Sequence, residues 1–222
     1  VMNAYLQGKI SEDTIRNAAI RLFTTRYLLG MFEETPYDNI PYEVVECKEH
    51  LQVAKRAQEE SIVLLKNDGI LPINRDTVKT VGVIGPNANS RLSLIGNYYG
   101  TSSRYITVLE GIQNVAGEDI RVLYSEGCDL SKEQVGNLAR ANKFLSEAKS
   151  VAEHSDLVIL CLGLDESLEG EEGDEGNDYK SGDKKDLELP KSQLNLLDSI
   201  IETKRPFVVC MMAGSSIDMK KI

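Results

Sequence analysis

The chain has 222 residues, of which 41% are hydrophobic and 27% charged, a composition typical of folded globular proteins and not of disordered or fibrous ones. Its 35 acidic and 25 basic side chains give a net charge of -10, which argues against a nucleic-acid partner because phosphate backbones repel an acidic surface. The longest apolar runs are far shorter than the ~20 residues of a membrane-spanning helix, so we expect one or two folded domains and no membrane span.

The N-terminal segment predicts one helix and then a linker. Ser11 is a suitable N-cap, acidic residues follow it, and apolar side chains repeat at helical spacing until Gly30. Residues 34–46 then hold two prolines and several acidic side chains, which is typical of an extended connection. We therefore expect a domain boundary in this segment.

Helix and strand patterns alternate beyond the linker. The predicted helices cover about 46–64, 108–115, 132–153 and 191–202, and the predicted strands cover 78–85, 120–124, 156–164 and 206–214. The strands are continuous runs of Val, Ile and Leu, as expected when helices cover both faces of a parallel sheet. The fold class is therefore α/β, with a mostly parallel sheet sandwiched between helices. Because the chain stops just after a strand, we expect this domain to be truncated at its C-terminus.

The sequence shows neither a metal-binding pattern nor a signal peptide. The four cysteines form no CxxC pair and the two histidines have no neighbouring ligands, so we expect buried free thiols and no metal centre. Residues 1–10 lack a charged segment followed by an apolar one, which favours a cytoplasmic location and leaves secretion open.

Candidate binding residues follow the strands, because ligands of open parallel sheets bind at the carboxyl ends of the strands. The loops to consider come after Ile84, Leu164 and Ala213. The first begins with Gly85 and Pro86 but lacks both a GxGxxG spacing and a Walker lysine, so it predicts a strand-exit turn and not a nucleotide site.

The second loop, residues 163–190, is strongly acidic and has three interpretations. A run of charge is by default a solvated surface loop. A hard-cation site is the second interpretation, although the D-x-D-x-D-G ladder of a calcium loop is missing. The third is a catalytic carboxyl group whose acidic neighbours raise its pKa toward the range of a general acid. Composition alone favours the first.

Several segments together resemble glycoside hydrolase family 3 over essentially the whole chain. They include SIVLLKN (61–67) with LPI (71–73), VGVIGPNA (81–88) and LEGEEGD (168–174). Members of this family are retaining, exo-acting β-glycosidases, chiefly β-glucosidases and β-xylosidases, built from a barrel domain followed by an α/β sandwich. The resemblance implies a split active site, with the nucleophilic aspartate on the barrel and the acid/base glutamate on a sandwich loop.

Mapped on this sequence, the resemblance makes residues 1–33 the last helix of a barrel that is otherwise absent. Residues 34–46 then form the interdomain linker, and residues 47–222 most of the sandwich. It places the nucleophile upstream, outside this chain, so that the N-terminal barrel of the same polypeptide is the required partner.

The acid/base is expected in the LEGEE run, whose register one sequence does not fix: Glu171 ranks first, Glu169 second and Glu172 third. In an extended segment Glu169 and Glu171 would point the same way, so that one carboxylate would help to keep the other protonated.

The resulting hypothesis is that the chain is part of a retaining exo-β-glycosidase. The whole protein is expected to hydrolyse terminal, non-reducing β-D-xylosyl or β-D-glucosyl residues of oligosaccharides and of aryl or alkyl β-glycosides, without a cofactor. The chain by itself is expected to be inactive, because it lacks the nucleophile. The alternative hypothesis is a non-catalytic α/β binding module whose acidic loop is solvated or binds a cation.

Overall fold

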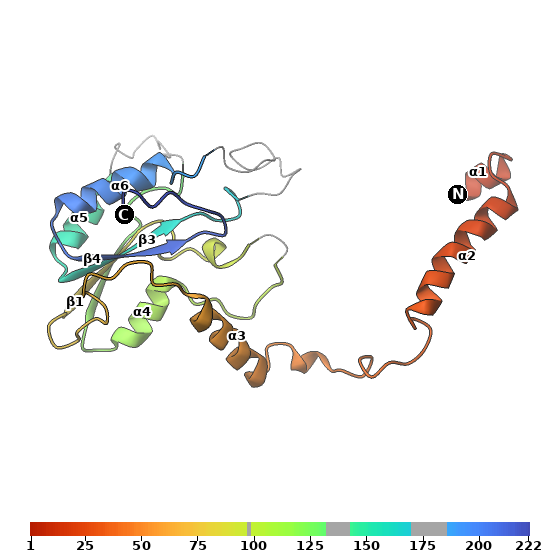
Figure 1. Cartoon of the computed structure of the whole chain (residues 1–222), viewed down its shortest axis with the longest axis horizontal. Helices are drawn as coiled ribbons and strands as arrows, with labels where there is room; N and C mark the ends of the chain where they lie inside the picture. Colours follow the sequence, from red (N-terminus) through yellow and green to blue (C-terminus); the bar gives the residue numbers. More distant parts are fainter. Residues whose placement is uncertain (97–98, 132–142, 170–185) are drawn as a thin grey trace. The chain divides into compact units, whose positions relative to one another are not determined.

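The computed structural model describes residues 1–96, 99–131, 143–169 and 186–222. These residues form two compact units, Val1–Val63 and Leu64–Ile222. Figure 1 shows the helices and strands of both units. In the described part of the chain, no helix has the length and apolar character needed to cross a membrane.

The first unit consists of helices and connecting segments. Its elements are α1 (Met2–Leu6), α2 (Glu12–Leu28), the 3-10 helix η1 (Tyr42–Val44) and α3 (Lys48–Ser61). The predicted N-cap is confirmed, since Ser11 Oγ accepts a hydrogen bond of 3.1 Å from the backbone N–H of Thr14. The predicted helix over 46–64 is shorter at both ends, because the backbone is already extended at Cys47 and at Ile62.

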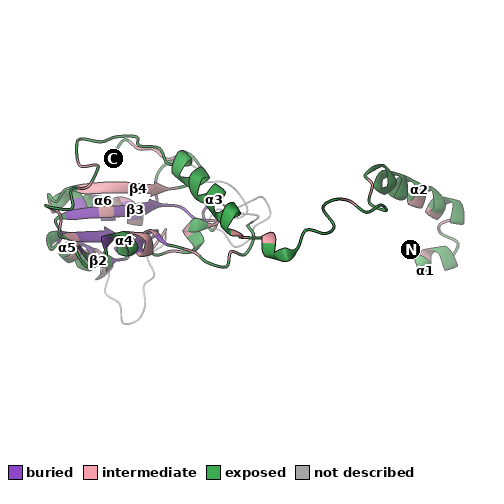
Figure 2. Ribbon diagram, turned by 90° about the horizontal axis from the view of Figure 1, so that it is seen from below, coloured by how far each residue is buried: buried purple, intermediate pink, exposed green. Residues whose placement is uncertain are grey.

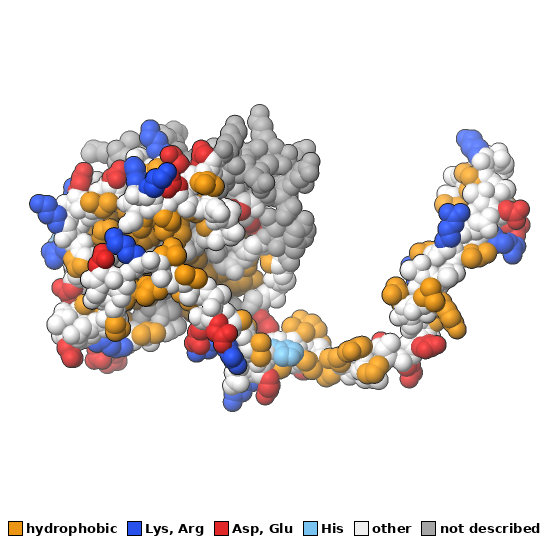
Figure 3. Space-filling view, viewed as in Figure 1, with side chains coloured by type: hydrophobic (Ala, Val, Ile, Leu, Met, Phe, Trp, Pro, Cys, Tyr) orange, Lys and Arg blue, Asp and Glu red, His pale blue; other side chains and the backbone are white. Residues whose placement is uncertain are grey.

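Apolar side chains of α2 and of the residues after it lie exposed in this unit (Figure 3). Examples are Leu22, Phe23, Tyr27, Leu28 and Leu29. The helix buries none of its residues. Neighbouring exposed apolar side chains are typical of a surface that packs against another one.

The second unit contains a four-stranded sheet whose paired strands all run parallel. Its strands are β1 (Thr80–Ile84), β2 (Arg121–Ser125), β3 (Leu157–Gly163) and β4 (Phe207–Met212), in the spatial order β2-β1-β3-β4. The register pairs Val81 with Leu157 and Cys161 with Cys210. The connecting helices are α4 (Val108–Ala116), α5 (Lys143–Glu153) and α6 (Lys191–Glu202), with the 3-10 helix η2 (Leu92–Leu94) after β1. The predicted α/β class and parallel sheet are confirmed.

Two apolar clusters cover the two faces of the sheet, with α5 and α6 on one side and α4 on the other (Figures 1 and 2). The first cluster contains Leu160 together with Ala148, Ala152, Leu196 and Ile200. The second contains Val81, Val83, Leu109, Ala116 and Cys161. Strand β3 therefore contributes to both clusters, which explains why its sequence is a continuous apolar run.

The expectation of buried thiols is only half correct. All four cysteines are free, and Cys128 and Cys161 are buried, but Cys47 and Cys210 are only partly covered. Cys210 lies on β4, the edge strand of the described sheet, where fewer neighbours cover a side chain. A hydrogen bond to Cys210 and burial together raise the pKa of Cys161, which keeps this thiol protonated.

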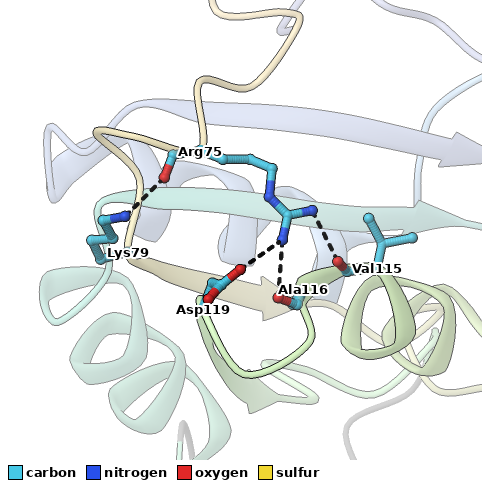
Figure 4. Close-up of polar contacts among 5 residues, drawn as sticks. All are labelled: Arg75, Lys79, Val115, Ala116 and Asp119. Carbon is cyan, nitrogen blue, oxygen red and sulfur yellow. Dashed lines mark hydrogen bonds and ion pairs between the residues drawn. The ribbon is translucent and has the colours of Figure 1, made fainter.

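Arg75 ties the segment before β1 to the end of α4 (Figure 4). Its Nη1 and Nη2 donate to the carbonyl oxygens of Val115 and Ala116 at 3.0 and 3.2 Å, and Nη2 lies 3.7 Å from Oδ2 of Asp119. A cation at this place satisfies carbonyl groups that have no partner within the helix and complements the helix dipole. Lys79 Nζ donates to the Arg75 carbonyl at 3.1 Å. The segment that leads into β1 is therefore held both by the side chain of Arg75 and by its carbonyl group.

Asp156 gives the fold a pH-dependent contact at the start of β1. Its Oδ2 accepts hydrogen bonds from the backbone N–H groups of Lys79 and Thr80 at 2.9 and 2.8 Å, and these bonds lower the pKa of Asp156 from 3.8. A lowered folded-state pKa stabilises the fold above the unfolded value, and this contribution is lost as the pH falls through the folded value. We therefore expect Asp156→Asn to reduce the loss of unfolding free energy between neutral pH and pH values below 3.8.

The measurement is urea denaturation of wild type and variant at a series of pH values. Asp76→Asn is the matched control, because Asp76 is an exposed aspartate in the turn before β1. If Asp156→Asn and wild type lose stability in parallel on acidification, the Asp156 contact is not the cause of that loss.

Candidate active site

Three loops meet at the carboxyl edge of the sheet, as the sequence predicts. The loop after β1 reaches the loop after β3, because Asn87 Nδ2 donates to the Leu164 carbonyl at 3.0 Å. The loop after β3 reaches the loop after β4 through Glu169. A cavity of about 260 Å³ lies among these loops, and its lining residues are Ile95, Gly96, Glu166, Glu169, Gly214 and Ser215. The three loops selected from the sequence, after Ile84, Leu164 and Ala213, thus all contribute to one cavity.

The acidic loop starts with a well-defined turn. Asp165 is buried, and its Oδ1 accepts hydrogen bonds from Ser167 N and Ser167 Oγ at 2.9 and 2.6 Å. The Asp165 carbonyl accepts from the backbone N–H groups of Leu168 and Glu169, each at 3.0 Å. The Leu168 side chain is 1% exposed and therefore anchors the turn in the core. Glu169 thus extends from a turn that is fixed by hydrogen bonds and by burial.

Gln193 joins the two ends of the acidic loop. This fully buried side chain lies in the first turn of α6, directly after the loop ends at Pro190. Its Oε1 accepts from the N–H of Gly163 at 2.9 Å, and its Nε2 donates to the Gly163 carbonyl at 2.7 Å. Nε2 also donates to the Leu130 carbonyl at 2.8 Å, which adds the loop after β2 to the same contact.

Glu169 is the predicted site residue that the structure describes. It is half-buried, and its carboxylate accepts hydrogen bonds from the backbone N–H groups of Gly214 and Ser215. Glu171 and Glu172 lie outside the described residues, so their roles remain predictions. The structure therefore places one of the three candidate glutamates in the wall of the cavity, and it places Glu166 beside it in the same wall.

Sequence reasoning did not select Gly214, Ser215, Asn87 or Gln193. Gly214 and Ser215 contribute backbone N–H groups, which carry no residue-specific signal. Asn87 and Gln193 could have been identified from the sequence. Each is a polar residue beside positions that the apolar pattern of the sequence assigns to the protein interior. Buried polar side chains are held by hydrogen bonds, so polar residues at interior positions mark places where backbone segments are joined.

The described residues of the acidic loop do not support the interpretation as a cation site. Among those residues, no three or more His, Cys, Asp or Glu side chains are arranged to hold a metal ion. Residues 170–185, which carry much of the acidic charge of this loop, lie outside the described residues.

Residues 62–222 match the family model described as "Glycosyl hydrolase family 3 C-terminal domain", which is more than half of the chain. The chain belongs to glycosyl hydrolase family 3. The matched range begins close to the start of the second unit and contains the sheet, the acidic loop and the cavity.

Relatives within family 3 support this assignment. The chain is 32% identical to "Probable beta-D-xylosidase 7" of Arabidopsis thaliana over 98% of its own length and 27% of that protein. A solved "GH3 exo-beta-xylosidase (XlnD)" in complex with a xylobiose aziridine probe is 30% identical, with a TM-score of 0.75 over 98% of this chain and 26% of that one. A β-glucosidase structure from Erythrobacter marinus is 28% identical, with a TM-score of 0.71 over 94% of this chain and 30% of that one. The chain thus spans between a quarter and a third of the length of these relatives.

Proposed function

We propose that this family 3 chain is part of a retaining exo-β-glycosidase and supplies the loop that carries its acid/base residue. The observation that carries the proposal is the cavity at the carboxyl edge of the sheet, with the acidic loop starting in its wall at Glu166 and Glu169. The loop is fixed at its start by Gln193 and by the turn at Asp165. A catalytic carboxyl group requires this kind of fixed starting point, because it must be held close to the productive geometry.

The proposed mechanism divides the two catalytic carboxyl groups between two domains. Residues 1–33 are proposed as the last helix of a barrel domain and 34–46 as the linker to the sandwich of residues 47–222. The exposed apolar side chains of α2 support this proposal, because such a helix needs a surface to pack against. An aspartate of the barrel would attack the anomeric carbon, while the acidic loop would provide the proton for the leaving oxygen. The two carboxyl groups of a retaining enzyme lie about 5–5.5 Å apart.

The acid/base residue is proposed to be Glu171, with Glu169 and Glu172 as the other candidates. In the first step it would protonate the departing oxygen, and in the second it would activate the water that hydrolyses the glycosyl-enzyme intermediate. This chemistry requires no cofactor. The substrate is proposed to be a terminal, non-reducing β-D-xylosyl or β-D-glucosyl residue, and the xylosidase names of the relatives favour xylose.

The full-length polypeptide is expected to hydrolyse p-nitrophenyl β-xyloside or β-glucoside and to release the β-anomer of the sugar first. Retention follows from two successive displacements at the anomeric carbon. Residues 1–222 alone are expected to give no turnover, because they lack the nucleophile. The measurements are initial rates and proton NMR of the first-formed sugar. An α-anomer as first product would contradict the retaining mechanism, and turnover by residues 1–222 alone would contradict the division of the site.

A further inference from the structure

We propose that Glu169 is a positioning residue: its carboxylate fastens the start of the acidic loop to the segment after β4, and it is not the group that protonates the leaving oxygen. This inference rests on the proposed function, since it assigns a role in the same loop. It separates Glu169 from the other two candidate glutamates by a contact that the structure describes.

Both carboxylate oxygens of Glu169 are used by consecutive backbone N–H groups. Gly214 N donates to Oε2 at 3.0 Å, and Ser215 N donates to Oε1 at 2.6 Å. The carboxylate also lies close against the backbone, because a Cβ at position 214 would stand 3.3 Å from Oε2. Hydrogen bonds to a charged acceptor are shorter and stronger than bonds between neutral groups, so this two-bond contact holds the loop firmly.

The same contact makes Glu169 poorly suited to proton donation. A general acid must present one oxygen, with its proton, to the departing oxygen within hydrogen-bond distance. In Glu169 each oxygen already faces an N–H group that can only donate. Both of these partners are donors, so neither of them can receive a proton from the Glu169 carboxyl group.

The Glu169 contact completes a series of three attachments along the first residues of the loop. Gln193 holds Gly163 at the end of β3, Leu168 is buried at the end of the turn, and Glu169 joins the turn to the loop after β4. The chain enters the following acidic segment directly from this last attachment. A misplacement of about 1 Å by a remote change costs up to about 10²-fold in rate, so release of Glu169 is expected to be felt in catalysis.

The test uses the full-length enzyme with Glu169→Gln and Glu169→Ala, and Glu188→Gln as the matched control. Glu188 is an exposed carboxylate at the other end of the same loop. Glutamine keeps the shape of Glu169 but replaces one acceptor oxygen with an NH₂ group that faces a donor. We expect kcat/KM to fall by about 10- to 100-fold in both Glu169 variants. The alkaline limb of the pH profile should remain, because the residue that titrates there is still present. Azide should not restore the rate, and the control should behave like wild type.

Three outcomes would overturn this inference. The first is loss of the alkaline limb together with azide rescue in Glu169→Ala, which would make Glu169 the acid/base itself. The second is an unchanged kcat/KM with a lower melting temperature, which would mean that the contact of Glu169 with Gly214 and Ser215 stabilises the fold but does not position the catalytic residue. The third is wild-type behaviour in every respect. Failure of the proposed function gives a different result, because the wild-type enzyme would then hydrolyse none of the β-glycosides.

Discussion

Replacement of Glu171 with alanine in the full-length enzyme is expected to lower kcat/KM for β-linked disaccharides by about 10²–10⁴-fold, the usual contribution of general acid–base catalysis. The loss should be much smaller for aryl glycosides with an acidic phenol, because such a leaving group departs without protonation. Their hydrolysis should then be limited by the second step, in which water needs a general base. Azide needs no base, so it should accelerate turnover and give a β-glycosyl azide product.

Glu172→Ala is the matched control for this experiment, because it removes the neighbouring carboxyl group from the same acidic run. Its rates should stay close to wild type on both kinds of substrate. If Glu172→Ala shows the selective loss and the azide rescue, the register of the acidic run is shifted by one residue. If neither variant shows them, the acid/base lies elsewhere, and the binding-module hypothesis for the acidic loop gains weight.

Most of the sandwich could be predicted because its signals are local. The apolar run of β3 is buried on both faces by α4, α5 and α6, and the helix predicted over 191–202 has the same ends in the structure. The helix over 46–64 was predicted too long, because Ile62, Val63 and Leu64 continue an apolar pattern after the backbone has become extended. Apolar patterning alone does not mark the place where helical dihedral angles end.

The position of the candidate site at the carboxyl edge of the sheet could be predicted, but the hydrogen bonds within it could not. Parallel topology brings the ends of β1, β3 and β4 to one edge, so the three loops could be selected from the order of strands and helices. The partners of Glu169 could not be selected, because Gly214 and Ser215 contribute only their backbone. The sequence ranks Glu171 before Glu169 but assigns neither carboxylate a binding partner. The structure distinguishes Glu169 by showing what its carboxylate binds.

Replacement of Gln193 with leucine is expected to lower the free energy of unfolding by about 2–5 kcal/mol, the range for breaking a buried hydrogen-bond network. Leucine has nearly the same volume, so no large cavity forms and the loss reports the hydrogen bonds. The N–H and the carbonyl of Gly163 lose their Gln193 partners in a buried place, and the Leu130 carbonyl loses its bond as well. Urea denaturation measures the effect.

Gln113→Leu on α4 is the control for Gln193→Leu, since Gln113 is exposed and its replacement should change the unfolding free energy by less than about 0.5 kcal/mol. Gln193→Glu separates donors from acceptors. As a carboxylate, glutamate still accepts from Gly163 N but no longer donates to the carbonyls of Gly163 and Leu130, and it brings a charge into the core; as a carboxylic acid it donates to only one of the two carbonyls. It should therefore be at least as unstable as the leucine variant. A Gln193→Glu variant as stable as wild type would mean that the two donated bonds contribute little, and that Leu168 and Glu169 hold the acidic loop in place without them.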